Sequence, residues 1–273
     1  MLKAFSSERS AARSAARASL GLAVLAGPLA LATAAHARPW EVTVGGNVST
    51  RPRYESSDRY NISPAPTFSI HPAKRYHRFS PPGDGTTISL IETRRISIGP
   101  MARFRSSRGS GGDFVGFNKV QWAAEPGGFI DLWPTDWLRA RVEIRRGIRG
   151  HQGWVGDAGL DLVYSGGKWD ASIGPRVGFG DQNYMNTYFG VTPAEAARSP
   201  FIDTAFTPKE GRRYTGLSAG IAYHFDRHWK TTLTGGYQHL ADNLARSPIV
   251  IATGSQHQYL GGIAVSYSFQ VGR

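Results

Sequence analysis

No cysteine occurs among the 273 residues of this sequence. Structural disulfides, thiolate nucleophiles and cysteine-ligated metal sites are therefore excluded. The sequence also has no apolar run of eighteen or more residues, so no segment predicts a membrane-spanning helix. Acidic residues are few, at 20 against 32 Lys and Arg. Glycine and aromatic residues are plentiful instead, which favours a chain rich in strands and turns over one built from helices.

The N-terminus has the three parts of a secretory signal peptide. Residues 1–19 carry four basic side chains and one acidic one, residues 20–32 are apolar, and Ala-His-Ala follows at residues 35–37. We therefore expect a cleaved signal peptide over residues 1–37 and a mature domain over residues 38–273. A mitochondrial transit peptide is the alternative, because the segment is rich in Arg and Ser, but the apolar core and the Ala-x-Ala site favour secretion.

Export and charge together limit the partners. The expected signal peptide holds four of the 32 basic and one of the 20 acidic residues, so the mature chain keeps a net charge of about +9. An exported protein has little access to nucleic acid, and we expect no nucleic acid as a partner. Outer-membrane lipid and the phosphates of lipopolysaccharide are the anionic partners that we expect instead.

Strict two-residue alternation dominates the C-terminal half. Over residues 169–179 every odd position is apolar and every even position is small or charged, which is typical of a strand with one apolar and one polar face. The pattern recurs over residues 158–164, 217–225, 229–237 and 259–269. Aromatic residues stand at the ends of the apolar faces, as the girdles at a membrane interface require. An exported chain with this pattern is better explained by a lipid-facing barrel than by a soluble sandwich.

The connections in this half alternate in length. The long or medium ones cover residues 147–153, 180–213 and 241–257, and the short ones cover residues 134–136, 165–168 and 226–228. Bacterial barrels have long outer loops and short periplasmic turns. We therefore expect the long loops outside the cell and the C-terminus in the periplasm.

The N-terminal half is less regular. Its candidate strands are residues 40–48, 62–70, 86–91, 96–104, 114–122 and 128–133. The alternation of long and short connections fails around residues 71–85. The expected fold is an all-β, transmembrane, antiparallel up-and-down β-barrel of about twelve strands, with ten as the alternative.

Several segments resemble those of one family of outer-membrane proteins. They are YESSD at residues 54–58, PAP at 64–66, GHQG at 150–153, DQNYMNTYFGVTPAEAARS at 181–199, SPIV at 247–250 and YSF at 267–269. In this order they resemble the MipA/OmpV family and span nearly all of the expected mature chain. The resemblance implies a closed barrel in the outer membrane of a Gram-negative bacterium. One departure is that four residues follow Phe269, where the family typically ends on the aromatic residue.

Function follows from the resemblance only in outline. It implies a scaffold that links a lytic transglycosylase to a penicillin-binding protein, while other members of the family are associated with adhesion, osmotic response or antibiotic uptake. Three functions therefore stay open. They are a non-catalytic scaffold for murein (peptidoglycan) enzymes, a small-solute or antibiotic-permeable pore, and a surface adhesin or structural barrel.

Charged side chains alternate with apolar ones over residues 138–145, and the charged set must face the lumen if the apolar set faces lipid. With the inward positions of the following strands, the candidate lumen cluster is Arg139, Arg141, Glu143, Arg145, Asp161, Asp170 and Arg176. Buried charges need partners, so the cluster predicts a lattice of ion pairs that fills a narrow barrel. The alternative is an electropositive constriction that selects anions. Asp161, and after it Asp170, are the expected partners of the arginines.

The segment of residues 180–213 contains a predicted helix. Thr192 is suited to the N-cap, Pro193 to the first helical position and Glu195 to the closure of a capping box, so we expect a helix over residues 193–198. Together with Tyr188 and Phe189, these residues are candidates for a lumen plug or a partner-binding loop. The alternative is a packed loop that stabilises the rim of the barrel.

The placement of the histidines does not favour catalysis. His151, His224, His239 and His257 could each pair with a serine, but the alternation of connections puts His151 and His224 at opposite ends of the barrel. We therefore expect no enzymatic activity. No cofactor and no metal are expected either.

Overall fold

The computed structural model of the chain describes residues 39–72, 79 and 84–272, of which residues 39–72 and 84–272 contain the strands and helices. The expected signal peptide and its cleavage site before Arg38 lie outside the described residues. No described helix is both long and apolar enough to cross a membrane.

All strands of the described residues belong to one antiparallel sheet. Ten of them have nine or more residues: β1 (Trp40–Pro52), β2 (Tyr60–Pro72), β5 (Ile96–Arg105), β6 (Ala123–Leu132), β7 (Leu138–Arg146), β9 (Trp154–Gly166), β10 (Trp169–Gly180), β11 (Gly211–His224), β12 (Trp229–Leu240) and β13 (His257–Val271). Three more have two residues each: β3 (Thr86–Thr87), β4 (Ile91–Glu92) and β8 (Ile148–Arg149).

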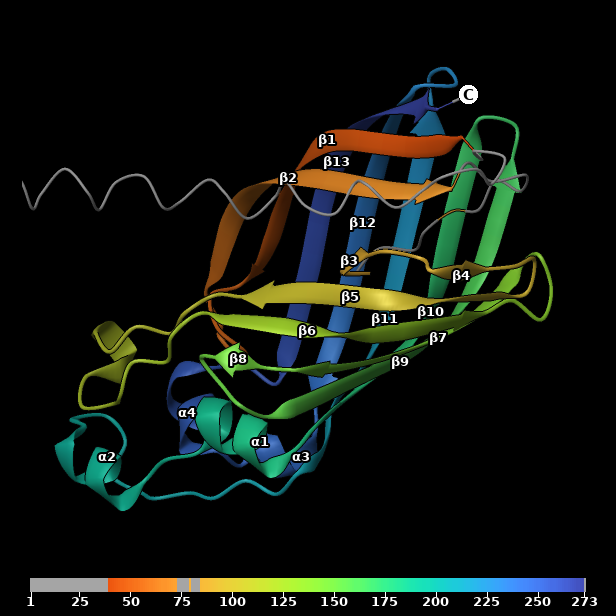
Figure 1. Cartoon of the computed structure of the whole chain (residues 1–273). Helices are drawn as coiled ribbons and strands as arrows, with labels where there is room; N and C mark the ends of the chain where they lie inside the picture. The colour runs from red at the N-terminus through yellow and green to blue at the C-terminus, as the bar shows by residue number, and fades with distance from the viewer. Residues whose placement is uncertain (1–38, 73–78, 80–83, 273) are drawn as a thin grey trace, which may run out of the picture. The chain divides into compact units, whose positions relative to one another are not determined.

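The sheet curves into a nearly closed barrel (Figure 1). Long strands pair with their neighbours in the chain, and β1 pairs with β13 from Trp40 opposite Val271 to Thr50 opposite Gly261. This pairing joins the two ends of the described chain in one ladder, so the all-β antiparallel up-and-down barrel is confirmed. The ring is least regular between β2 and β5, where the short strands β3 and β4 pair with β5.

The connections alternate between the two ends of the barrel. Four helices and the 3-10 helix η1 (Gly112–Phe114) lie in the long loops at one end, which we call the loop end. The helices are α1 (Gln182–Phe189), α2 (Pro193–Arg198), α3 (Asp242–Ala245) and α4 (Pro248–Thr253). The C-terminus lies with the short connections at the opposite end, which we call the turn end.

Two of the expected N-terminal strands differ from the structure. Residues 114–122 form no strand, because Phe114, Phe117 and Val120 are buried in the packed loops at intervals of three residues rather than alternating between two faces. Residues 86–91 are divided into β3 and β4, although Ile88 and Leu90 still donate backbone hydrogen bonds to β5. The other expected strands are present, with shifted ends.

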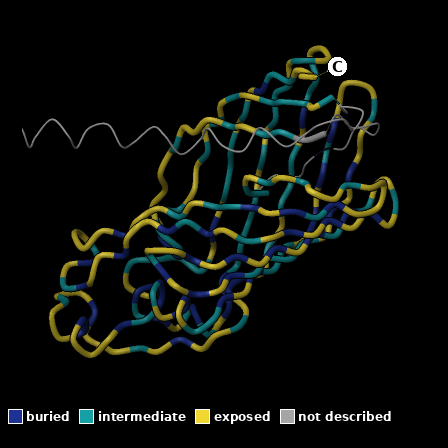
Figure 2. Tube along the Cα trace, in the orientation of Figure 1, coloured by how far each residue is buried: buried dark blue, intermediate teal, exposed yellow. Residues whose placement is uncertain are grey.

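Exposed positions alternate with more buried ones along the strands (Figure 2). This alternation is expected when successive side chains point out of the barrel and into its lumen. On β10, Ile173 is 47% exposed on the outer face, whereas its neighbour Ser172 is 6% exposed on the inner face. Aromatic rings gather at both ends of the outer face. Trp169 and Tyr223 are in contact at the turn end, and Tyr237 and Tyr259 at the loop end. An outer face that is apolar in the middle and aromatic at both rims is suited to a lipid bilayer.

Candidate functional site

The lumen of the barrel is the candidate site, and strand β7 forms its charged wall. Arg139, Arg141, Glu143 and Arg145 are all buried on the inner face, whereas Val142 and Ile144 are exposed on the outer face. The alternation in the sequence therefore places four charged side chains in a column along one strand. The structure surrounds this column with acids and further arginines from the neighbouring strands.

Glu143 is the centre of the column. Its carboxylate accepts hydrogen bonds from Arg141 at 2.6 Å and from Arg145 at 2.5 Å on its own strand, and from Arg103 of β5 at 2.8 Å. Toward the turn end, Asp131 of β6 lies 2.8 Å from Arg139 and 2.9 Å from the Arg141 guanidinium. Each of these arginines thus has a carboxylate within hydrogen-bond distance, as buried charges require.

Asp161 extends the network across β9 to β10. Its carboxylate lies 3.4 Å from Arg139 and 2.5 Å from Arg176. Asp170 lies elsewhere, which corrects the expectation that it is the second partner of the β7 arginines. It pairs in register with Ser165 at the turn end, and its carboxylate is 2.6 Å from the His224 ring.

A second group of charges lies toward the loop end and includes residues that the sequence did not single out. Glu125 of β6 binds Arg145 at 3.2 Å, Arg105 of β5 at 2.7 Å and the His151 Nε2 at 3.0 Å. The Gly153 backbone N–H donates to His151 Nδ1, so the Nε2 nitrogen carries the proton that is donated to Glu125. The contact with Glu125 therefore orients a buried imidazole ring.

Arg213 joins this group because of a β-bulge. The register between β10 and β11 shifts at Phe179, which pairs with Arg212, while Gly178 pairs with Tyr214. The extra residue turns Arg213 inward, where it binds Asp157 of β9 at 2.9 Å and Glu55 of the β1–β2 loop at 2.8 Å. Strict alternation would have placed Arg213 on the lipid face, so the sequence pattern missed it.

The connection between β2 and β3 also contributes to the lumen. Asp84 lies 2.6 Å from Arg139 and 3.4 Å from Arg141. Phe79, which is 2% exposed, packs with Trp133 and with the inward side chains Val163 and Ala222 near the turn end. Phe79 and Asp84, which belong to the stretch where the alternation of long and short connections fails, thus lie inside the barrel.

The loop end is capped by helix α1. Asp181 is its N-cap and accepts a hydrogen bond from the Tyr184 backbone N–H. Tyr184, Met185, Tyr188 and Phe189 are buried in one apolar cluster, whose other members are Val120, Val155, Tyr214, Leu240, Leu244 and Val250. Burial raises the pKa of the Tyr188 phenol, so this group stays neutral inside the cap. The Tyr184 hydroxyl donates to Glu55 and also accepts from Arg213, so the cap is continuous with the charged network below it.

The helix expected over residues 193–198 is present as α2, with the expected capping box between Thr192 and Glu195. Thr192 and Pro193 are exposed, and α2 lies among the loops beyond the ends of the strands (Figure 1) rather than in the lumen. Glu195 is buried and accepts backbone hydrogen bonds from Thr192 and Asn118 at 3.1 Å. Burial opposes its ionisation, but these hydrogen bonds hold its pKa below the usual value. Glu195 therefore ties the β5–β6 loop to the β10–β11 loop.

The opposite wall of the lumen is uncharged over most of its length. Along the middle of β12, β13 and β1 the inward side chains are mostly short, and include Thr232, Thr234, Ala264, Asn47 and Thr43. Lys230 and Glu41 lie inward near the turn end. Thr43 and Ser268 share a hydrogen bond of 2.7 Å between their hydroxyls. One side of the lumen is thus crowded with arginines and carboxylates, and the middle of the other side is lined mostly by short neutral groups.

Two short motifs in β11 and just after it match the sequence spacing of a catalytic serine and of a metal-binding histidine pair. The match is limited to the spacing. Residues 216–220 read GLSAG, the pattern of a serine nucleophile, but Ser218 lies in the middle of a strand instead of at a strand-to-helix turn. His224 and His228 are four residues apart, and they bind Asp170 and the Ser268 carbonyl. Within the described residues, no group of three or more His, Asp and Glu side chains is arranged to hold a metal ion.

Comparison with known proteins identifies one family. The model of the family described as MltA-interacting protein MipA matches residues 44–269. A search of curated proteins found no match.

Three solved structures are similar to the chain. The COG4313 outer membrane channel from Pseudomonas putida F1 is 12% identical over 86% of this chain and 97% of its own, with a TM-score of 0.40. OmpT of Vibrio cholerae is 8% identical over 89% of this chain and 100% of its own, with a TM-score of 0.34. The N-terminal β-barrel domain of OprF from Pseudomonas aeruginosa is 12% identical over 64% and 96%, with a TM-score of 0.28.

Proposed function

Because the chain belongs to the family of the MltA-interacting protein MipA, we propose that it is a non-catalytic outer-membrane barrel that anchors a periplasmic murein enzyme. The expected partner is a lytic transglycosylase, with a penicillin-binding protein as a second partner on the same scaffold. Export would follow from cleavage of residues 1–37 before Arg38.

The observation that carries this proposal is the filled lumen. The aromatic cap of α1 covers the loop end, the arginine–carboxylate network crosses the middle, and Phe79 packs inside near the turn end. A barrel filled at three levels is better suited to present a surface than to pass solutes. This arrangement favours the ion-pair lattice over the anion-selective constriction.

The proposed orientation puts the turn end in the periplasm and the loop end outside the cell. Long outer loops and short periplasmic turns are the rule for bacterial barrels, and the C-terminus lies with the short turns. The turn end would then face the murein layer. Trp137, in the β6–β7 turn, is 57% exposed there, and an exposed tryptophan is a frequent anchor of protein interfaces.

Substitution of Trp137 with serine should weaken capture of the transglycosylase by about tenfold or more, because loss of an aromatic anchor commonly costs more than the 1.4 kcal/mol that corresponds to tenfold in affinity. The measurement is binding of a purified periplasmic lytic transglycosylase to the full mature chain in detergent. Phe201→Ser is the matched control, since Phe201 is 63% exposed in a loop at the opposite end. Absence of binding to the unaltered chain, or an equal loss in both variants, would overturn the scaffold or its orientation.

A small-solute pore is the second candidate, and the neutral wall of β12, β13 and β1 favours it. The short hydroxyl side chains and the glycines of this wall do not fill the lumen by themselves. A solute path would have to run along this wall and leave through the packed loops around α1. The conductance measurement that ends the Discussion separates this candidate from the scaffold.

A further inference from the structure

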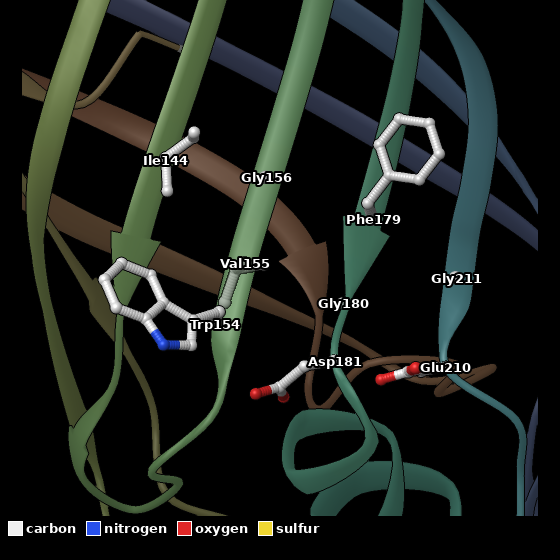
Figure 3. A pocket seen from close by; sticks show the side chains of 9 residues that line it. All are labelled: Ile144, Trp154, Val155, Gly156, Phe179, Gly180, Asp181, Glu210 and Gly211. Atoms are coloured by element: carbon white, nitrogen blue, oxygen red, sulfur yellow. The ribbon is translucent and has the colours of Figure 1, made fainter.

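A hollow lies on the outer face of the barrel at the loop end, between β7 and β11 (Figure 3). It has a volume of about 370 Å³. Ile144, Trp154 and Phe179 form its apolar sides, and glycine in place of larger side chains opens it. Gly156 is one of these glycines, and a Cβ built on it would meet only the Glu143 carbonyl at 3.6 Å. The hollow therefore has room for an acyl chain at the height of the aromatic girdle.

Two arginines flank the hollow on the same outer face. Arg146 pairs in register with Trp154, and its guanidinium lies 5.6 Å from the centre of that ring. Arg212 pairs in register with Phe179 on the other side. Both are exposed, and the structure gives neither of them an acidic partner among the residues that it describes. The strands of the two arginines are separated by three strand spacings, or about 14 Å.

Two carboxylates close the hollow toward the loops. Asp181 and Glu210 lie at its loop end in Figure 3. Asp181 uses one oxygen to accept from the Tyr184 backbone, and Glu210 uses one to accept from the Gln182 backbone. Their remaining oxygens are acceptors for the hydroxyl groups of a ligand.

We propose that this hollow binds a lipid with two phosphates at opposite ends of a sugar headgroup, the chemistry of the lipid A part of lipopolysaccharide. One acyl chain lies against Ile144, Trp154 and Phe179, each phosphate binds one guanidinium, and sugar hydroxyls donate to the carboxylates. The separation of Arg146 from Arg212 favours two phosphates over one. The location at the outer leaflet rests on the proposed orientation, although binding in detergent does not depend on it.

Native mass spectrometry of the mature chain in detergent, with bis-phosphorylated lipid A added, tests the proposal. The unaltered chain should retain one lipid A, and Gly156→Leu should retain about tenfold less because its side chain fills the hollow from the floor. Gly235→Leu is the matched control, since Gly235 is an outward strand glycine with open space around it, far from the hollow. The pair Arg146→Gln and Arg212→Gln should also lose about tenfold, whereas Arg227→Gln at the turn end should lose nothing.

Comparison of different lipids tests whether the site selects the two phosphates of lipid A over the phosphates of other anionic lipids. Lipid A with one phosphate removed should bind more weakly than the bis-phosphorylated form, and phosphatidylglycerol more weakly still. Equal retention by Gly156→Leu and Gly235→Leu, equal binding of the two forms of lipid A, or equally tight binding of cardiolipin would each overturn the proposal. Capture of the transglycosylase is measured separately, so failure of the lipid site and failure of the scaffold are distinguishable.

Discussion

Replacement of Glu143 with alanine should lower the free energy of unfolding of the barrel by about 3–5 kcal/mol, the cost of breaking a buried ion pair by removal of one partner. Glu143 binds three arginines, and two of them, Arg141 and Arg145, are almost completely buried. Without the carboxylate, these guanidinium groups lose a short contact and face one another across the same column. Urea titration of the chain folded in detergent or lipid, followed by tryptophan fluorescence, measures the effect.

Asp203→Ala is the control for Glu143→Ala, because Asp203 is an exposed acid in a loop. Its substitution should change the free energy of unfolding by less than about 0.5 kcal/mol. Glu143→Gln should lie between the two, since the amide keeps the shape and one acceptor but not the charge. If Glu143→Ala and Asp203→Ala shifted the urea midpoint equally, the charged column would have no structural role.

Replacement of Phe189 with alanine should destabilise the loop cap by about 3–5 kcal/mol, the usual cost of truncating a fully buried aromatic side chain. Phe189 is fully buried among Tyr184, Met185 and Leu244, and its backbone carbonyl accepts a hydrogen bond from Ser247. The loss falls on the loops and leaves the strand ladder intact. The loops should therefore open before the barrel unfolds.

Limited proteolysis measures this local opening. Phe189→Ala should be cut within the β10–β11 loop many times faster than the unaltered chain, while the strands stay protected. Phe201→Ala, an exposed aromatic residue of the same loop, should be cut at the unaltered rate. Equal rates for the two variants would show that α1 is a surface helix and not a cap.

The charged network has an energetic cost that bears on its role. Desolvation of buried ions offsets much of their attraction, so such networks contribute less to stability than their contacts suggest. An apolar filling of similar volume would serve a barrel equally well on energetic grounds alone. What arginine adds is a rigid fork with five donors, which fixes neighbouring strands in one register and keeps the lumen narrow. The network is thus better suited to a barrel that presents a surface than to one that passes solutes through its lumen.

The strands and the inward charges could be predicted because both depend on local alternation. Residues 169–179 became β10, and the charged residues at positions 139, 141, 143 and 145 of β7 face inward, because a two-residue period fixes the face of every side chain in a regular strand. The helix α2 was predictable for the same local reason, since its capping box lies within four residues.

The rest of the lumen depends on contacts that no local pattern encodes. Arg213 faces inward because a bulge adds one residue to β11, and the alternation gives no sign of this bulge. Asp84, Phe79 and Glu55 come from connections that would ordinarily be assigned to the surface. The buried apolar residues of α1 resemble those of any packed loop until the barrel beneath them is known. Side chains that are far apart in the sequence therefore complete the lumen site only in the folded barrel.

Single-channel recording in a planar lipid bilayer tests the central claim, that the lumen is filled, most directly. The full mature chain, folded and inserted at a few copies per membrane, should give no steady conductance steps, because the aromatic cap, the ion-pair column and Phe79 obstruct the lumen at three levels. Insertion is verified independently by protease protection of the strands. Large, steady conductance steps from the inserted, unaltered chain would contradict the filled lumen and establish the pore in its place.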